Sequence, residues 1–228
     1  KTIALAPDRV SVFGYAHLPD VLPHQRLIRS EELPCHEARA ELALLADRML
    51  VRGGYRRVGF DHYARASSPL ARAAAEGRLR RNFQGFTEDR ARTIIGFGAS
   101  AISTIGALQA QNAKDLAAYY AAVEAHGFAT ERGIEATGQE RVVGRTIETL
   151  LCRGEADISA VLAAATPAEA NAICGRLDAL EADGVVSWRG DIVSVPEEAR
   201  LLSRIAAAAL DPYEQSLFAP AGTGSLAI

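Results

Sequence analysis

The sequence predicts an α/β protein, in which the parallel strands of a barrel or open sheet are followed by a mainly helical, winged-helix-like domain. Two observations predict this class. Over residues 1–130, short apolar runs alternate with a helix or a long crossover and end in polar or glycine-rich segments. Residues 131–215 instead carry successive helix signals and one hairpin. We expect 216–228 to be a disordered tail, because its end consists largely of small residues.

Composition narrows the class of protein. The chain has 228 residues, of which 49% are hydrophobic and 23% charged, as in ordinary globular domains. Its net charge of −3 gives no reason to expect binding to nucleic acid or to anionic membranes. No apolar run approaches the roughly 18 residues that span a bilayer, and no signal peptide opens the chain.

The three cysteines, Cys35, Cys152 and Cys174, are far apart in the sequence. Their spacing and odd number predict neither a disulfide framework nor a metal site, so we interpret them as reduced thiols of a cytoplasmic protein. The first residue is Lys1, not methionine, and a strand-like run follows closely. This start suggests a fragment of a longer protein.

The first elements follow from apolar patterns and glycine stops. Residues 9–14 are predicted to form a buried strand, and the proline-containing segment 15–34 to be irregular. A one-sided apolar pattern predicts a helix over 36–52 that ends at a pair of glycines. Residues 55–60 are predicted to form a second strand.

The next segments complete the first part. Alanine-rich residues 69–77 predict a short helix closed by glycine. Residues 92–98 are predicted to form a third strand, which ends in the small-residue run 99–103. A helix is expected over 114–126, and 127–136 is interpreted as a connector.

Helix start signals dominate the last part. Thr137 and Glu140 form a capping box that opens a helix through Leu151. A short helix over 157–165 precedes a longer one over 166–182, which begins with a threonine cap and a proline. The remaining elements are a hairpin with a Gly-Asp turn and a helix that starts at a proline, over 184–195 and 196–210.

The predicted strand ends indicate where a site would lie. In parallel α/β folds, functional groups gather just after the carboxyl ends of the strands. This rule selects three places along the chain. They are Ala16 and His17, Asp61 and His62, and the run 98–103.

Several motifs of the first part occur in one order. They are Val-Phe-Gly-Tyr-Ala-His at 12–17, Gly-Phe-Asp-His-Tyr at 59–63, Arg-Asn-Phe-Gln-Gly-Phe-Thr at 81–87 and Gly-Ala-Ser-Ala-Ile-Ser at 98–103. In this ordered set the chain resembles the C-terminal half of the oxygen-independent coproporphyrinogen III oxidases, over most of residues 7–155.

The resemblance implies a radical S-adenosylmethionine enzyme with a partial (β/α) barrel. In that family a [4Fe–4S] cluster reduces S-adenosylmethionine to methionine and a deoxyadenosyl radical, which takes a hydrogen atom from a propionate of coproporphyrinogen III. Loss of CO₂ and one electron then leaves a vinyl group, and two such steps give protoporphyrinogen IX in haem biosynthesis. The resemblance also implies an electron donor as a partner and a monomeric protein.

Matching motifs assign candidate contacts to S-adenosylmethionine. The resemblance implies that Ala16, Ile102 and Gln84 contact this cofactor, with Phe13 as a further contact. Alanine and isoleucine offer backbone groups and apolar surface, and the amide of Gln84 both donates and accepts hydrogen bonds.

Candidate substrate contacts rest on the chemistry of the side chains, and each has an alternative. His17 follows a strand end, where it is a substrate contact or a backbone cap. Asp61 and His62 bind substrate or form a structural hydrogen-bonded pair. Arg81, next to Arg80, suits the propionate carboxylates, whereas the alternative is an exposed basic pair.

One expected motif is missing. The family binds its cluster through a Cys-x-x-x-Cys-x-x-Cys motif, and the chain contains no such motif. We therefore predict that the chain alone has no oxidase activity and binds no metal. Two alternatives stay open: a homologue from the haem-chaperone branch of the superfamily, and a non-catalytic regulatory module. The helix over 166–182 has too few basic residues for nucleic-acid binding.

Overall fold

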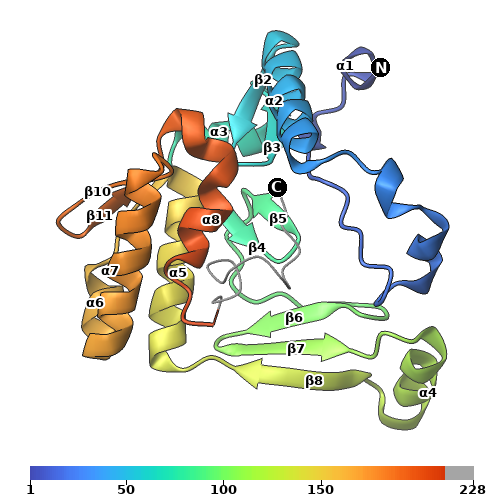
Figure 1. The fold of residues 1–228 in the computed structure, drawn as a ribbon. Helices are drawn as coiled ribbons and strands as arrows, with labels where there is room; N and C mark the ends of the chain where they lie inside the picture. Colours follow the sequence, from blue (N-terminus) through green and yellow to red (C-terminus); the bar gives the residue numbers. More distant parts are fainter. Residues whose placement is uncertain (214–228) are drawn as a thin grey trace.

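The computed structural model describes residues 1–213, in which helices pack against four small sheets (Figure 1). The α/β class is confirmed. The tail expected over 216–228 lies outside the described residues. Within 1–213, no helix combines the length and the apolar character needed to cross a membrane.

The first sheet has the strand order β1-β3-β2, with β1 at Arg9–Ser11, β2 at Tyr55–Val58 and β3 at His62–Arg65. Helices α2 (His36–Arg52) and α3 (Pro69–Ala75) pack against this sheet. The segment between β1 and α2 is irregular, as predicted, apart from two short 3-10 helices. The short helices outside this sheet are α1 at Thr2–Leu5, η1 at Pro23–Leu27 and η2 at Ser30–Glu32.

Parallel pairing, which the sequence led us to expect, is not found within residues 1–213. All strand pairs described there are antiparallel, including β2 with β3. Three residues join β2 to β3, and Gly59 in this turn has a φ of 59°. A parallel crossover needs about a dozen residues or more, so a turn this short requires a hairpin. Strand β3 was not predicted, because its sequence, His-Tyr-Ala-Arg, is not an apolar run.

The middle of the chain forms a hairpin and a three-stranded sheet. The hairpin consists of β4 (Arg80–Asn82) and β5 (Gly85–Thr87). The sheet consists of β6 (Ile102–Ile105), β7 (Leu108–Asn112) and β8 (Thr130–Glu135) in that order. Figure 1 shows this sheet at the bottom of the molecule, away from the β1–β3 sheet at the top.

Two predictions in this region were wrong. The strand expected over 92–98 is an extended segment in which Ile94 alone forms a bridge, to Thr104. The expected connector 127–136 contains β8, which pairs with β7. Every residue of β8 is exposed, so this strand lacks the alternating apolar pattern that marks a half-buried strand. Helix α4 (Leu116–His126) confirms the helix expected before it.

The last part of the described chain has its own apolar core. Fully buried side chains come from several of its elements, including Leu150, Leu177 and Leu210. Its helices and strands are α5 (Gly138–Arg153), β9 (Glu155–Asp157), α6 (Ser159–Ala164), α7 (Pro167–Ala182), β10 (Ser187–Arg189), β11 (Ile192–Ser194), η3 (Glu197–Leu202) and α8 (Ser203–Ala208).

The capping signals of this part are confirmed. Thr137 with Glu140 and Thr166 with Glu169 each form both hydrogen bonds of a capping box. Strands β10 and β11 pair as the predicted hairpin, and β9 adds a third strand. The single helix expected over 196–210 is instead divided into η3 and α8.

Candidate functional site

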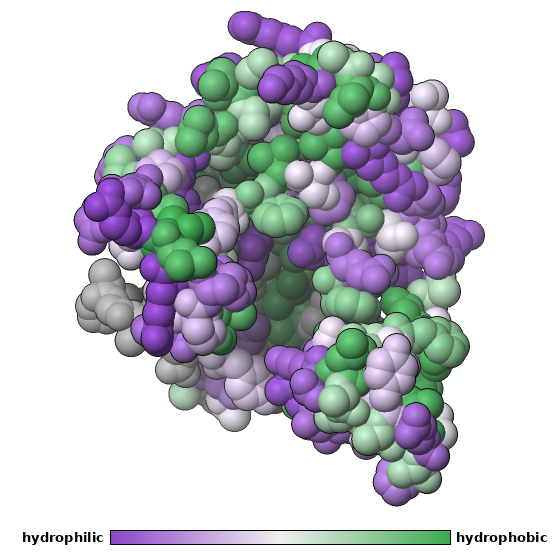
Figure 2. All heavy atoms as spheres, turned by 90° about the vertical axis from the view of Figure 1, so that its right-hand side faces the viewer, coloured by the Kyte–Doolittle hydropathy of each residue, from purple (hydrophilic) through white to green (hydrophobic). Residues whose placement is uncertain are grey.

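A cavity of about 280 Å³ opens between the end of β1, helix α2 and helix α8. It brings together three predicted site residues, Phe13, His17 and Asp61. Two arginines that the sequence analysis did not select, Arg39 and Arg204, also line it. Figure 2 shows that one side of the molecule is hollowed near its centre, with apolar side chains at the bottom of the hollow. These residues lie together because the end of β1 runs beside the β2–β3 turn. The Val12 amide donates a hydrogen bond to the Asp61 carbonyl there (2.8 Å).

Asp61 and His62 form a hydrogen-bonded pair. Asp61 Oδ1 lies 2.6 Å from His62 Nδ1, and both side chains are mostly buried. The His62 ring packs edge-on against Phe86, with 5.3 Å between ring centroids. Its other edge faces Gly85, where a Cβ atom would lie 2.9 Å from Nε2. The carboxylate therefore fixes the orientation of the imidazole ring, and Gly85 leaves room for it.

Arg81 is stacked between two aromatic rings. The centre of its guanidinium lies 5.0 Å from the Phe60 centroid and 4.8 Å from the Phe86 centroid. Its Nη1 is buried and has no hydrogen-bond partner within residues 1–213. Burial lowers the pKa of Arg81, although nearby Asp61 opposes that shift. A buried charge without an ion partner is unfavourable. An anion bound to the Arg81 guanidinium would supply that partner.

The alternative of an exposed basic pair is wrong. Arg80 Nε donates to Glu148 Oε1 over 2.6 Å, and this carboxylate also accepts from the Arg81 amide at 3.1 Å. The ion pair raises the pKa of Arg80. Arg80 is thereby held against helix α5, while the side chain of Arg81 is left for the aromatic stack.

His17 is held on one side of its ring. Nε2 lies 3.3 Å from Ser30 Oγ, and the ring stacks at a tilt on Tyr15, with 5.9 Å between centroids. Nδ1 is buried and has no hydrogen-bond partner among the described residues. The backbone-capping alternative for this ring has no hydrogen bond to support it within 1–213.

The other predicted cofactor contacts lie outside the lining of this cavity. Ala16 is exposed, and its carbonyl accepts a hydrogen bond from Gln25 Nε2 (3.1 Å). Gln84 is exposed in the β4–β5 turn, and Ile102 is the half-buried first residue of β6. Phe13, at 78% exposure, offers an open apolar face beside the cavity.

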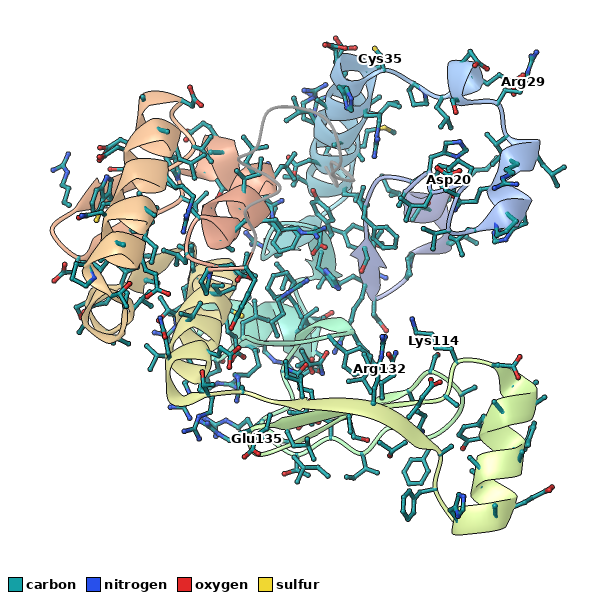
Figure 3. The ribbon with its side chains drawn as sticks, turned by 60° about the horizontal axis from the view of Figure 1, so that its bottom comes forward. Asp20, Arg29, Cys35, Lys114, Arg132 and Glu135 are labelled. Atoms are coloured by element: carbon teal, nitrogen blue, oxygen red, sulfur yellow. The ribbon has the colours of Figure 1, made fainter. Side chains whose placement is uncertain are left out.

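The cysteines do not fit a cluster. Within residues 1–213, no group of three or more His, Cys, Asp or Glu side chains is placed to hold a metal ion. Cys35 is exposed at the start of α2, and Figure 3 shows it at the outer end of that helix. Burial raises the pKa of Cys152 to about 12.

A buried ionic network behind the cavity was not foreseen. Arg57 donates twice to Asp47, at 2.8 and 2.7 Å, and Tyr63 donates to the same carboxylate at 2.8 Å. Arg200, from η3, reaches Asp47 at 3.1 Å and also donates to the carbonyl of Gly59. This network joins the last part of the chain to the turn that carries Asp61. No sequence signal pairs residues so far apart.

A solved structure has the same fold over nearly the whole of this chain. The structure superposes on the solved coproporphyrinogen III oxidase of Escherichia coli, described as a radical SAM enzyme, with a TM-score of 0.83 and 36% identity. The match covers 93% of this chain and 50% of that one. No family model matches the chain.

Two curated relatives carry the same name. The oxygen-independent coproporphyrinogen III oxidase of Bradyrhizobium diazoefficiens is 40% identical over 215 residues, which are 93% of this chain and 48% of that protein. The protein of the same name from Cereibacter sphaeroides is 41% identical over 218 residues, 95% of this chain and 48% of its own length. The chain thus spans about half the length of these relatives.

The fold is therefore that of part of a radical SAM enzyme. Within this class, the chain is a relative of the oxygen-independent coproporphyrinogen III oxidases over nearly its whole length, as its motifs predicted.

Proposed function

We propose that the chain is the C-terminal half of an oxygen-independent coproporphyrinogen III oxidase. The complete enzyme would convert two propionates of coproporphyrinogen III to vinyl groups by oxidative decarboxylation, giving protoporphyrinogen IX in haem biosynthesis. The observation that carries this proposal is the identity of 40% and 41% to relatives of that name across more than nine-tenths of the chain. The proposal includes a cytoplasmic monomer served by a separate electron donor.

The residues of this chain would bind and orient the cofactor and the substrate. Bound S-adenosylmethionine and a [4Fe–4S] cluster would supply the radical chemistry, with the cluster ligands in the other half of the enzyme. Ala16, Phe13, Gln84 and Ile102 are the proposed contacts to S-adenosylmethionine. The exposure of Ala16, Phe13 and Gln84 supports this assignment. Ile102 is half-buried at the start of β6.

His17, Asp61, His62 and Arg81 are the proposed substrate contacts. Arg81 would pair with a carboxylate, which the unpartnered Nη1 supports. Asp61 would hold the His62 ring, as their 2.6 Å hydrogen bond suggests. Their aromatic neighbours would keep water from the reacting propionate.

We also propose the domain division 1–130 and 131–215, the first a piece of a partial (β/α) barrel and the second a winged-helix-like domain. The separate apolar core from Val143 to Leu210 supports the division. Strand β8 crosses the boundary, and α5 contacts β4, so the two parts would move as one.

Anaerobic reconstitution tests the proposed reaction. The complete protein that carries this chain, loaded with iron and sulfide and given S-adenosylmethionine and a reductant, should convert coproporphyrinogen III and release CO₂. The 228-residue chain treated in the same way should produce none. Conversion by this chain alone would contradict its predicted inactivity. Haem binding by the complete protein, without conversion, would favour the chaperone alternative.

A variant tests the cofactor assignment. Gln84→Ala in the complete protein should weaken binding of S-adenosylhomocysteine about tenfold, the value of one lost hydrogen-bonding side chain. The control is Gln109→Ala, because Gln109 is an exposed residue of β7. Equal affinity in both variants would remove Gln84 from the proposed contacts.

A further inference from the structure

We propose that the cavity between β1, α2 and α8 binds a carboxylate arm of the tetrapyrrole substrate, with Arg39 and Arg204 as the carboxylate partners. This inference rests on the proposed function and assigns residues that neither the motifs nor the comparisons select. It gives the C-terminal helix α8 a direct part in substrate recognition.

The cavity combines apolar walls with cationic groups. Its apolar lining includes Val12, Leu42, Phe60 and Leu201. A volume of about 280 Å³ is at the lower end for small-molecule sites, so it suits one substituted ring, not a whole macrocycle. A pyrrole ring with a propionate has this combination of an apolar body and one negative charge.

Neither arginine forms an ion pair within residues 1–213. The side chain of Arg204 has no hydrogen bond there, and the one side-chain hydrogen bond of Arg39 runs to the carbonyl of Tyr15 (3.3 Å). The acidic side chain in the lining is Asp61, which is hydrogen-bonded to His62. Arg204 also lies close enough to Arg81 for their charges to repel. An incoming carboxylate would relieve this excess of positive charge.

His17 supplies a second, independent indication of a ligand. Its Nδ1 is buried without a partner among residues 1–213, and the ring lines the same cavity. When the Ser30 hydroxyl donates to Nε2, Nδ1 carries the proton and can donate it to an anion. A buried polar atom without a hydrogen bond is unfavourable, and a bound carboxylate oxygen would satisfy it.

S-adenosylmethionine also carries a carboxylate, but its other charges argue against it here. Its ammonium and sulfonium groups would meet Arg39 and Arg204, with Asp61 already committed to His62. A porphyrinogen brings carboxylates and no fixed positive charge. The cavity therefore favours the propionate over the amino-acid end of the cofactor.

Binding measurements on the complete protein test the inference. The probes are coproporphyrin III, which is air-stable and keeps all the propionates, its tetramethyl ester, and S-adenosylhomocysteine. We expect Arg204→Gln and Arg39→Gln each to weaken coproporphyrin III binding at least tenfold, and to leave S-adenosylhomocysteine binding unchanged. The wild-type protein should bind the ester more weakly than the acid, because an ester cannot form an ion pair with these arginines or with Arg81. Arg189→Gln is the control, because Arg189 is exposed on β10.

The outcomes separate this inference from the proposed function. If the wild-type protein binds coproporphyrin III but neither variant weakens it, the arginine assignment is overturned and the proposed function stands. If the variants weaken only S-adenosylhomocysteine, the cavity holds the cofactor and the propionate assignment is overturned. If the wild-type protein binds no coproporphyrin III, both fail. Arg204→Lys should restore part of the affinity, since lysine keeps the charge without the bidentate geometry.

Discussion

Arg200 Nη2 lies 3.1 Å from Asp47 Oδ1, and this ion pair fastens η3 to α2 across 153 residues of sequence. Arg200 also donates to the Gly59 carbonyl and to the Tyr63 hydroxyl, the latter at 3.3 Å. Both side chains of the pair are nearly buried, at 12% and 11% exposure. The contact therefore fixes the β2–β3 turn, and with it Asp61, relative to the last part of the chain.

Asp47→Asn should destabilise the fold by about 1–3 kcal/mol, because it removes the counter-charge that the nearly buried Arg200 shares with Arg57. The effect is limited because Arg57 is exposed and keeps its ion pair with Glu197. Urea unfolding at pH 7 measures the loss. Asp89→Asn is the matched control, since Asp89 is exposed in a loop and makes no ion pair within residues 1–213. Equal loss of stability in both variants would show that Asp47 stabilises the fold no more than an exposed carboxylate does.

The same carboxylate makes stability depend on pH. Hydrogen bonds from Arg57 are the main cause that lowers the pKa of Asp47 to about 2, below the value near 3.9 of an unfolded chain. Because the folded pKa is the lower one, this stabilisation is complete above about pH 4 and is lost as the pH falls towards 2. The free energy of unfolding of the wild-type protein should fall by about 1 kcal/mol between pH 5 and pH 3 because of Asp47 alone. The drop attributable to Asp47 should be absent in Asp47→Asn, and equal pH dependence in both proteins would refute the assignment.

Gly85→Ala should destabilise the protein by about 1–3 kcal/mol and disturb the Asp61–His62 pair. Gly85 has a φ of 131°, which side chains rarely adopt, and its new Cβ would lie 2.9 Å from His62 Nε2. Thermal unfolding measures the cost, and the NMR chemical shifts of the His62 ring report the change at the ring.

Gly175→Ala is the control for this substitution. Gly175 lies in α7, and no atom lies within 4 Å of the position that an alanine methyl group would take there. Alanine at this position should therefore be neutral or stabilise the helix by up to about 1 kcal/mol. A stabilising effect of Gly85→Ala would contradict the close packing at His62.

Local signals were readable from the sequence, and contacts between distant segments were not. We predicted the capping box at Thr137, the threonine cap at Thr166 and helix α2, because each depends on neighbouring residues. The strand β8 was missed because all of its residues are exposed. At the site, the position after a predicted strand end selected His17 and Asp61, which do line the cavity. Arg204 was missed because only tertiary folding carries α8 to the end of β1.

The cysteines should differ sharply in reactivity. Cys35 is exposed, whereas burial, reinforced by Glu148, raises the pKa of Cys152 to about 12. Alkylation proceeds through the thiolate, so at pH 8 iodoacetamide should modify Cys35 more than about a hundredfold faster than Cys152. Peptide mass spectrometry over time measures both rates, and Cys35→Ser should remove the fast phase. In denaturant the two rates should converge, because the difference comes from burial in the folded chain. Fast labelling of Cys152 in the folded protein would show that the contact between α5 and the hydrophobic core around Val58, Leu70 and Phe86 opens in solution.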